Sequence, residues 1–350
     1  MGRDSLMIGA TMEDATAAAA PFDARYRYLA GGIRPAGTCT ATCAPDCADW
    51  WGCWQDPALP PGQYLLDHLR TTAAAAWQGS ARPQMPVITY YEILQSLQVA
   101  EGAAEVAAVN DAAFLGRYLD DWRFLLQRIG DARVMLHIEP DFWGFVRQVN
   151  ENPHAVPAPV AQANPTDCSA HENSMAGLAR CMIAMTRKYA PMAAVGLHAS
   201  PWDYTVAGDG AAVSAFMVAL GAADGDFVVT DPADRDAGYY SSLGQDRWWT
   251  DASAAQYLAW SRQVADGVGR PTVIWQVPLG NMAQNNTRNH WQDTRLDYLF
   301  AHLREVALAG IVALLFGAGM PDQTTPESDG GNLVARTTAN WRAGGTALCQ

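Results

Sequence analysis

The chain has 350 residues, a formal net charge of −13 and only 23 lysine and arginine residues. This acidic balance excludes nucleic acid as an expected partner, because phosphates require a basic face. No apolar run reaches the ~18 residues that a membrane-spanning helix needs, so we expect no membrane partner. We expect one domain over residues 1–350, since barrels of alternating strands and helices reach this length.

Short apolar runs recur along the chain, and most are rich in valine, isoleucine, leucine and tyrosine. There are eight of them, at 6–12, 26–31, 86–91, 134–139, 194–200, 227–231, 272–277 and 311–317. Most are too short for helices, so they are typical of buried parallel strands. Segments with helical spacing of apolar residues lie between and around them, at 61–77, 110–129, 174–189, 210–222, 252–268 and 294–309. The pattern predicts an α/β fold, a (β/α)8 TIM barrel, with long loops at 143–172 and 280–293.

The first β/α unit is expected to be irregular and rich in cysteine. Only an alanine-rich stretch, 15–20, separates the first two runs, and Cys39, Cys43, Cys47 and Cys53 precede the first well-formed helix. No CxxC pair is present, so the spacing suits disulfides better than zinc, and we expect at least one disulfide in this loop. Disulfides persist in oxidising compartments, which predicts a secreted protein. The other three cysteines, Cys168, Cys181 and Cys349, lie far from one another. The odd total leaves at least one thiol that is free or paired in a way that the sequence does not reveal.

The carboxyl ends of barrel strands form the catalytic face, so the residues that end each run are the candidates for chemistry. The fourth run ends with His137, Glu139, Asp141 and Trp143 within seven residues. Carboxylates at this rim are costly unless they bind or react, although a salt-bridged or loop-capping pair is the plain alternative. Alternation along a strand predicts that the side chains of His137 and Glu139 point in the same direction.

The other strand ends supply a second carboxylate and polar or aromatic contacts. Asp231 stands directly at the end of the sixth run. The chain has 13 tryptophans and 12 tyrosines, and aromatic rings in a cleft suit the apolar faces of sugars, with core packing as the alternative for each ring. We expect substrate contacts from Tyr91, His137, Trp143, His198, Trp202, Trp275, Gln276 and Trp291.

Two resemblances accompany these motifs. Glu139-Pro140 resembles the acid/base motif on strand four of the retaining glycoside hydrolases in the large (β/α)8 clan of cellulases, mannanases and β-galactosidases, with Ile138 where that clan has asparagine. The clan's nucleophile position on strand seven is Gln276, which cannot form a glycosyl ester. The segments 28–32, 139–144, 234–238 and 275–281 resemble more closely a group of uncharacterised secreted bacterial barrel proteins, which implies the fold and secretion but no reaction.

These patterns predict a secreted, monomeric glycoside hydrolase that acts on a poly- or oligosaccharide without a cofactor or metal. We expect Glu139 as the acid, with Asp231 as the preferred partner carboxylate and Asp141 next. A separation of ~6.5–9.5 Å between the carboxyl groups predicts inversion, and ~5–5.5 Å predicts retention. Two alternatives stay open: a non-catalytic glycan-binding barrel, and a metal-dependent hydrolase that uses His137, Glu139, His198 and Asp231 as ligands.

Overall fold

Eight parallel strands form a closed barrel in which each strand pairs with its neighbours in sequence and β1 pairs with β8. The structure is a computed structural model that describes residues 4–33, 62–75, 77, 83–97 and 99–348. The strands are β1 (Met7–Ala10), β2 (Ala24–Leu29), β3 (Met85–Tyr90), β4 (Met135–Ile138), β5 (Ala194–His198), β6 (Phe227–Thr230), β7 (Thr272–Val277) and β8 (Ile311–Phe316). Every predicted run overlaps one of them, although β2 and β3 begin two residues and one residue before their runs, and the closed barrel confirms the (β/α)8 prediction.

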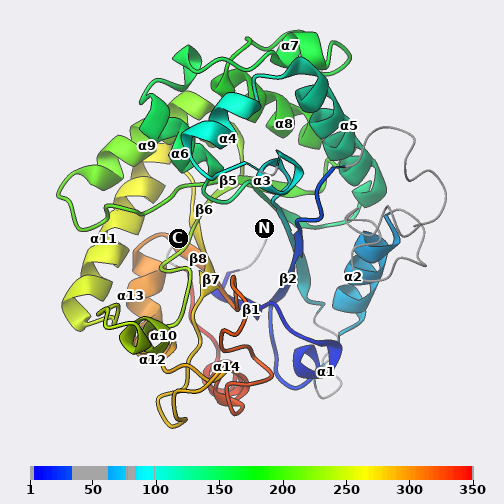
Figure 1. The fold of residues 1–350 in the computed structure, drawn as a ribbon. Coiled ribbons are helices and arrows are strands. Elements are labelled where there is room, and N and C mark those ends of the chain that lie inside the picture. Colours follow the sequence, from blue (N-terminus) through cyan, green and yellow to red (C-terminus); the bar gives the residue numbers. More distant parts are fainter. Residues whose placement is uncertain (1–3, 34–61, 76, 78–82, 98, 349–350) are drawn as a thin grey trace.

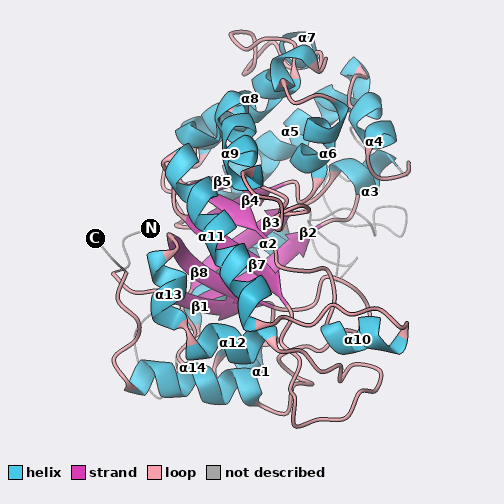
Figure 2. Cartoon of the chain, turned by 90° about the vertical axis from the view of Figure 1, so that its left-hand side faces the viewer, coloured by secondary structure: helices cyan, strands magenta, loops and turns pink. Residues whose placement is uncertain are grey.

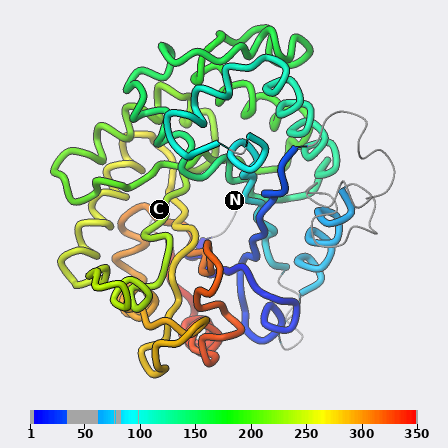
Figure 3. Tube along the Cα trace, in the orientation of Figure 1, coloured from blue at the N-terminus to red at the C-terminus, as the bar shows by residue number. Residues whose placement is uncertain are grey.

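Helices surround the barrel in sequence order, as the colours of the trace show (Figures 1 and 3). The long ones are α2 (Gln63–Ala74), α5 (Ala112–Ile129), α8 (Met175–Tyr189), α9 (Asp209–Leu220), α11 (Asp251–Val268) and α14 (Asn332–Arg342). The short ones are α1 (Asp14–Ala17), α3 (Ile93–Leu97), α4 (Ala103–Ala108), α6 (Phe142–Val149), α7 (Val160–Ala163), α10 (Ala237–Ser242), α12 (Arg295–Ala301) and α13 (Leu303–Leu308). Among the described residues, no helix is both long and apolar enough to cross a membrane.

The structure differs from the predicted elements in several places, and helices α3, α4, α10 and α14 were not predicted. The segment 143–172, expected as a loop, begins within α6 and also contains a 3-10 turn, Pro153–Ala155, and α7. The single helix expected at 294–309 is divided into α12 and α13, because His302 leaves helical geometry at φ −126° and ψ 30°. The first β/α unit is irregular as predicted, since α1 has only four residues. The predicted cysteine loop, with Cys39, Cys43, Cys47 and Cys53, lies outside the described residues.

Side chains alternate along each strand, so that one set faces the barrel interior and the other faces the surrounding helices. The inward set packs inside the barrel and includes Tyr26, Met135, Phe227 and Trp275, while the outward set packs against the helices. Gly196 makes room for the Phe227 ring, because a Cβ at position 196 would stand 2.5 Å from it. Figure 2 shows α3, α4 and α10 on one side of the barrel, with both chain ends on the opposite side. The helices that directly follow strand ends therefore mark the carboxyl rim, meaning the face at which the strands end.

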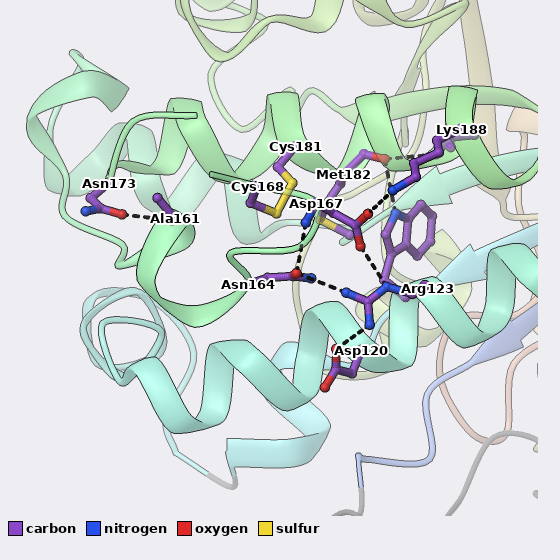
Figure 4. Close-up of a disulfide and its surroundings, with 12 residues drawn as sticks. Asp120, Arg123, Ala161, Asn164, Asp167, Cys168, Asn173, Cys181, Met182 and Lys188 are labelled. Carbon is purple, nitrogen blue, oxygen red and sulfur yellow. Dashed lines mark hydrogen bonds and ion pairs between the residues drawn. A yellow bond between two sulfur atoms is a disulfide. The ribbon is translucent and has the colours of Figure 1, made fainter. Parts of the chain in front are cut away.

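A buried disulfide links Cys168, which lies before α8, to Cys181 within that helix (Figure 4). Polar contacts next to it fasten the same segment to α5. Asp167 accepts hydrogen bonds from Arg123 at 2.6 Å and from Lys188 at 2.7 Å, and Arg123 also contacts Asn164 at 2.9 Å. The sequence did not pair these two cysteines, because their separation of 13 residues forms no recognised motif.

Replacing both Cys168 and Cys181 with alanine is expected to lower the free energy of unfolding by roughly 2–4 kcal/mol, because the bridge restricts the unfolded chain. Urea denaturation of the wild type and the double variant measures the difference. Arg262→Ala, which removes an exposed ion pair to Asp266, serves as a control with an expected change below about 1 kcal/mol. Equal midpoints for the double variant and the wild type contradict a stabilising bridge.

Candidate active site

Three side chains from consecutive strand ends form a polar cluster at the carboxyl rim, here called the rim cluster: Asp141, His198 and Asp231. Asp141 follows β4, His198 ends β5 and Asp231 follows β6. One carboxylate oxygen of each aspartate and one ring nitrogen of His198 lie within 4.8 Å of one another. His198 Nε2 is 3.1 Å from Asp231 Oδ1 and 3.9 Å from Asp141 Oδ1. The side chains of Asp141 and Asp231 are 39% and 19% exposed, so both carboxyl groups can meet a ligand.

A chain of hydrogen bonds inside the barrel ends on Asp231. Thr89 Oγ1 lies 3.3 Å from His137 Nδ1, and His137 Nε2 lies 3.0 Å from His198 Nδ1. An ionised Asp231 only accepts, so His198 Nε2 donates to it. Burial, together with the neighbouring His198, holds the pKa of His137 well below its usual value. His137 is therefore neutral and orients His198 toward Asp231.

Aromatic rings support this chain from inside the barrel. The Trp275 ring meets His137 edge to face at 4.8 Å and Tyr28 at 5.5 Å between centroids. Burial raises the pKa of Tyr28 well above its usual value, and the charges of Asp231 and Asp141 act in the same direction. Tyr28 therefore keeps its proton beside the two carboxyl groups.

The turn after β4 separates Glu139 from His137, and the expectation that they share a direction is wrong. Glu139 has a φ of 46° and Asp141 a φ of 63°, both in the left-handed region, so the pleat of the strand does not continue. Glu139 is fully buried and accepts hydrogen bonds from the backbone N–H groups of Glu92 and Ile93, at 3.1 and 3.2 Å, and from the Tyr118 hydroxyl at 2.9 Å. These contacts fasten the start of α3 to α5. A catalytic role for Glu139 stays a prediction.

Two carboxyl groups near the rim bind protons more readily than usual. Burial raises the pKa of Glu139 to about 8, against the lowering effect of its hydrogen bonds. Burial also raises the pKa of Asp141 to about 6; the neighbouring His198 opposes this rise and the charge of Asp231 adds to it. Asp141 is thus the exposed carboxyl group that is suited to donate a proton in mildly acidic solution.

The remaining predicted contact residues divide between the rim and the core. Trp143 is buried and donates to the backbone oxygen of Ile138 at 3.1 Å, and it lines a pocket beside the rim cluster. Trp291 donates to the backbone oxygen of Asp322 at 2.8 Å, among the loops after β7 and β8. Trp202 is 44% exposed, on the loop after β5.

Gln276 and Tyr91 complete the set of predicted contacts. Gln276 has a φ of 55° and is nearly buried, and its amide occupies the space beside Gly319, where a Cβ would lie within 1.3 Å of Nε2. Tyr91 is half-buried; burial raises its pKa, and the charge of Asp141 acts in the same direction.

Sequence reasoning omitted Thr89 and Tyr28 from the candidate site. Both lie on strands where alternation gives a usable signal: Thr89 pairs with His137 in the register of β3 and β4, and Tyr28 pairs with Thr89 in the register of β2 and β3. Inward-facing polar residues one layer below the strand ends were therefore detectable once the strand register was known.

Comparisons with known proteins show the fold. No family model matches the sequence, and no curated protein matches it. The structure resembles a modular endo-β-1,4-mannanase of glycoside hydrolase family 26 from Cellulomonas fimi, with a TM-score of 0.52, 13% identity and coverage of 96% of this chain and 70% of that one. It also resembles a family 5 xyloglucan-specific β-1,4-glucanase from a ruminal metagenomic library, with a TM-score of 0.54, 9% identity and coverage of 97% and 89%. For a family 26 endo-β-1,4-mannanase from Bacillus sp. JAMB-750 the TM-score is 0.53, the identity 11% and the coverage 97% and 86%. The chain thus has the barrel fold that these glycoside hydrolases share.

The pH dependence of stability tests the state of Glu139. Its pKa rises from 4.5 to about 8 on folding, so between these values the folded state binds more protons and the free energy of unfolding falls as the pH rises. Glu139→Gln removes this titration while Oε1 still accepts the same hydrogen bonds. Urea denaturation at pH 5 and pH 8 should show a larger loss for the wild type than for this variant. If the free energy of unfolding falls equally between pH 5 and pH 8 in the wild type and in Glu139→Gln, Glu139 is not protonated in the folded protein.

Proposed function

We propose that this protein is a secreted glycoside hydrolase that cleaves a poly- or oligosaccharide with the carboxyl groups of Asp141 and Asp231. The observation that carries the proposal is the pair itself: two partly exposed carboxyl groups whose oxygens approach within 4.8 Å at the carboxyl rim. Glycoside hydrolysis needs such a pair, one protonated and one ionised. The likeness of the barrel to polysaccharide hydrolases supports the proposal at the level of the fold.

The two carboxyl groups take different roles because their surroundings differ. Asp141, with a pKa of about 6, gives its proton to the glycosidic oxygen as the bond between that oxygen and the anomeric carbon breaks. Asp231, oriented by His198, attacks the anomeric carbon and forms a glycosyl ester. Water then hydrolyses the ester while Asp141 accepts its proton. The short separation is nearer to the ~5–5.5 Å of retaining enzymes than to the ~6.5–9.5 Å of inverting ones.

Secretion is part of the proposal. The Cys168–Cys181 bridge supports it, because structural disulfides persist in oxidising compartments. The acidic chain also suits an uncharged substrate better than an anionic one.

Substitution of the carboxyl groups tests the catalytic pair. Asp231→Asn and Asp141→Asn are each expected to lower kcat by about 10³-fold or more, because each removes a group that acts on the reacting bond. Glu139→Gln and Gln276→Ala should stay within about tenfold of the wild type. Hydrolysis of mannan, xyloglucan and cellulose, measured as reducing ends, provides the rates.

Three outcomes would change the assignment. Loss of turnover in Glu139→Gln with retention in Asp141→Asn makes Glu139 the acid, as the sequence predicts. Retention in Asp231→Asn removes Asp231 from the pair. Oligosaccharide binding without turnover of any polysaccharide favours a non-catalytic glycan-binding barrel.

A metal-dependent hydrolase is the second candidate, because the rim cluster offers one imidazole and two carboxylates within 4.8 Å. Such donors suit zinc, and His137 behind His198 resembles the outer partners that orient metal-bound histidines.

Metal analysis separates the two candidates. On the glycoside hydrolase proposal, the purified protein holds well below one equivalent of zinc, manganese or nickel, and dialysis against EDTA leaves polysaccharide hydrolysis unchanged. One bound equivalent, together with loss of activity on chelation and recovery on adding the metal, establishes the metal-dependent alternative.

A further inference from the structure

A recess of about 320 Å³ opens beside the rim cluster, between α6, the loop after β5 and α9. We call it the lateral recess. Val213, Phe216 and Met217 from α9 form an apolar floor. Gly144 permits the close approach of α6, because a Cβ at this position would stand 2.6 Å from Ser200 Oγ and 2.8 Å from the Trp202 ring. The recess is therefore a formed part of the fold.

Ser200 points to a polar ligand in the lateral recess. Its side chain is more than nine-tenths buried, it lines the recess, and its hydroxyl has no hydrogen-bond partner among the described residues. Buried hydroxyl groups are nearly always paired, since an unpaired one has lost its water without compensation. A ligand hydroxyl in the recess would supply the missing partner.

Trp202 offers a flat surface at the opening. Its indole is 44% exposed and packs on Phe145 at 4.9 Å between centroids, which holds the ring in place. A rigid exposed ring next to an apolar floor and a buried hydroxyl matches a pyranose, which has both an apolar face and hydroxyl groups.

The charges around the recess exclude an anionic sugar. Arg147 is paired with Asp209 at 3.0 Å, so its charge is already compensated. Glu151 and Asp203 add two exposed carboxylates to the lining. The balance is negative, which opposes uronic acids and favours an uncharged ring.

The lateral recess lies next to the proposed catalytic pair, because His198 both lines it and contacts Asp231. We infer that the lateral recess is a subsite that binds one uncharged pyranose of the substrate chain next to the bond that Asp141 and Asp231 cleave. This inference rests on the proposed function, and it assigns the substrate to neutral glycans.

Calorimetric titration in an Asp231→Asn background, where turnover is removed, tests the subsite. The probes are cellohexaose, mannohexaose and, as the anionic comparison, hexagalacturonic acid. Adding Trp202→Ala or Ser200→Ala is expected to weaken binding of a neutral hexasaccharide by roughly tenfold. Trp341→Ala is the matched control, because Trp341 is also half-exposed (42%) and also packs on one ring, that of Trp77, at 4.9 Å, but lies on α14. The control should bind as the background does.

The outcomes of the two proposals are distinguishable. Unchanged binding in both recess variants overturns the subsite, even where the wild type hydrolyses polysaccharide. Failure of both neutral probes to bind, or tighter binding of hexagalacturonic acid, overturns it as well. The recess variants could bind the neutral hexasaccharides more weakly while the wild type hydrolyses no polysaccharide. That result overturns the proposed hydrolase activity and keeps the lateral recess as a glycan-binding site.

Discussion

The backbone turn after β4 decides which carboxyl group reaches the carboxyl rim. Glu139 and Asp141 flank Pro140 with left-handed φ values, a conformation that costs of order 1–3 kcal/mol for each such residue. Three hydrogen bonds to Glu139 and the burial of Phe142 and Trp143 on α6 offset that cost. A regular continuation of the strand would keep Glu139 on the His137 side, facing the barrel interior. The turn instead sends Glu139 outward to α3 and α5, and it brings Asp141 to His198.

The interior beneath the rim tolerates polar side chains because hydrogen bonds connect Thr89, His137 and His198 there while His137 stays neutral. His137 and His198 lie 3.0 Å apart, and two imidazolium ions at that distance in a buried site would repel strongly. Burial and the neighbouring His198 hold the pKa of His137 well below its usual value, so His137 stays neutral and a second imidazolium does not form. The carboxyl groups of Asp141 and Asp231 are partly exposed at the surface above these rings, where a substrate can approach.

The sequence contained most of the fold and only part of the site. Strand positions were predictable because each buried run ends in polar or turn-forming residues, and the rim position of Asp231 and His198 followed directly from them. The direction of Glu139 was not predictable, because a left-handed φ at a non-glycine residue has no local signature. Burial of Trp143 was equally hidden, since an indole serves a core or a cleft with the same sequence pattern. The division of the last predicted helix at His302 depends on tertiary packing rather than on periodicity.

Strand order places the proposed catalytic pair on one side of the barrel. At the two strand ends where the retaining clan keeps its carboxylates, this barrel has a buried Glu139 and a neutral Gln276, both in left-handed conformations. The exposed carboxyl groups come instead from the ends of β4 and β6, which flank β5 in the barrel. His198 ends β5, so it necessarily stands between them. The proposed chemistry is therefore confined to one side of the carboxyl rim, which is also the side of the lateral recess.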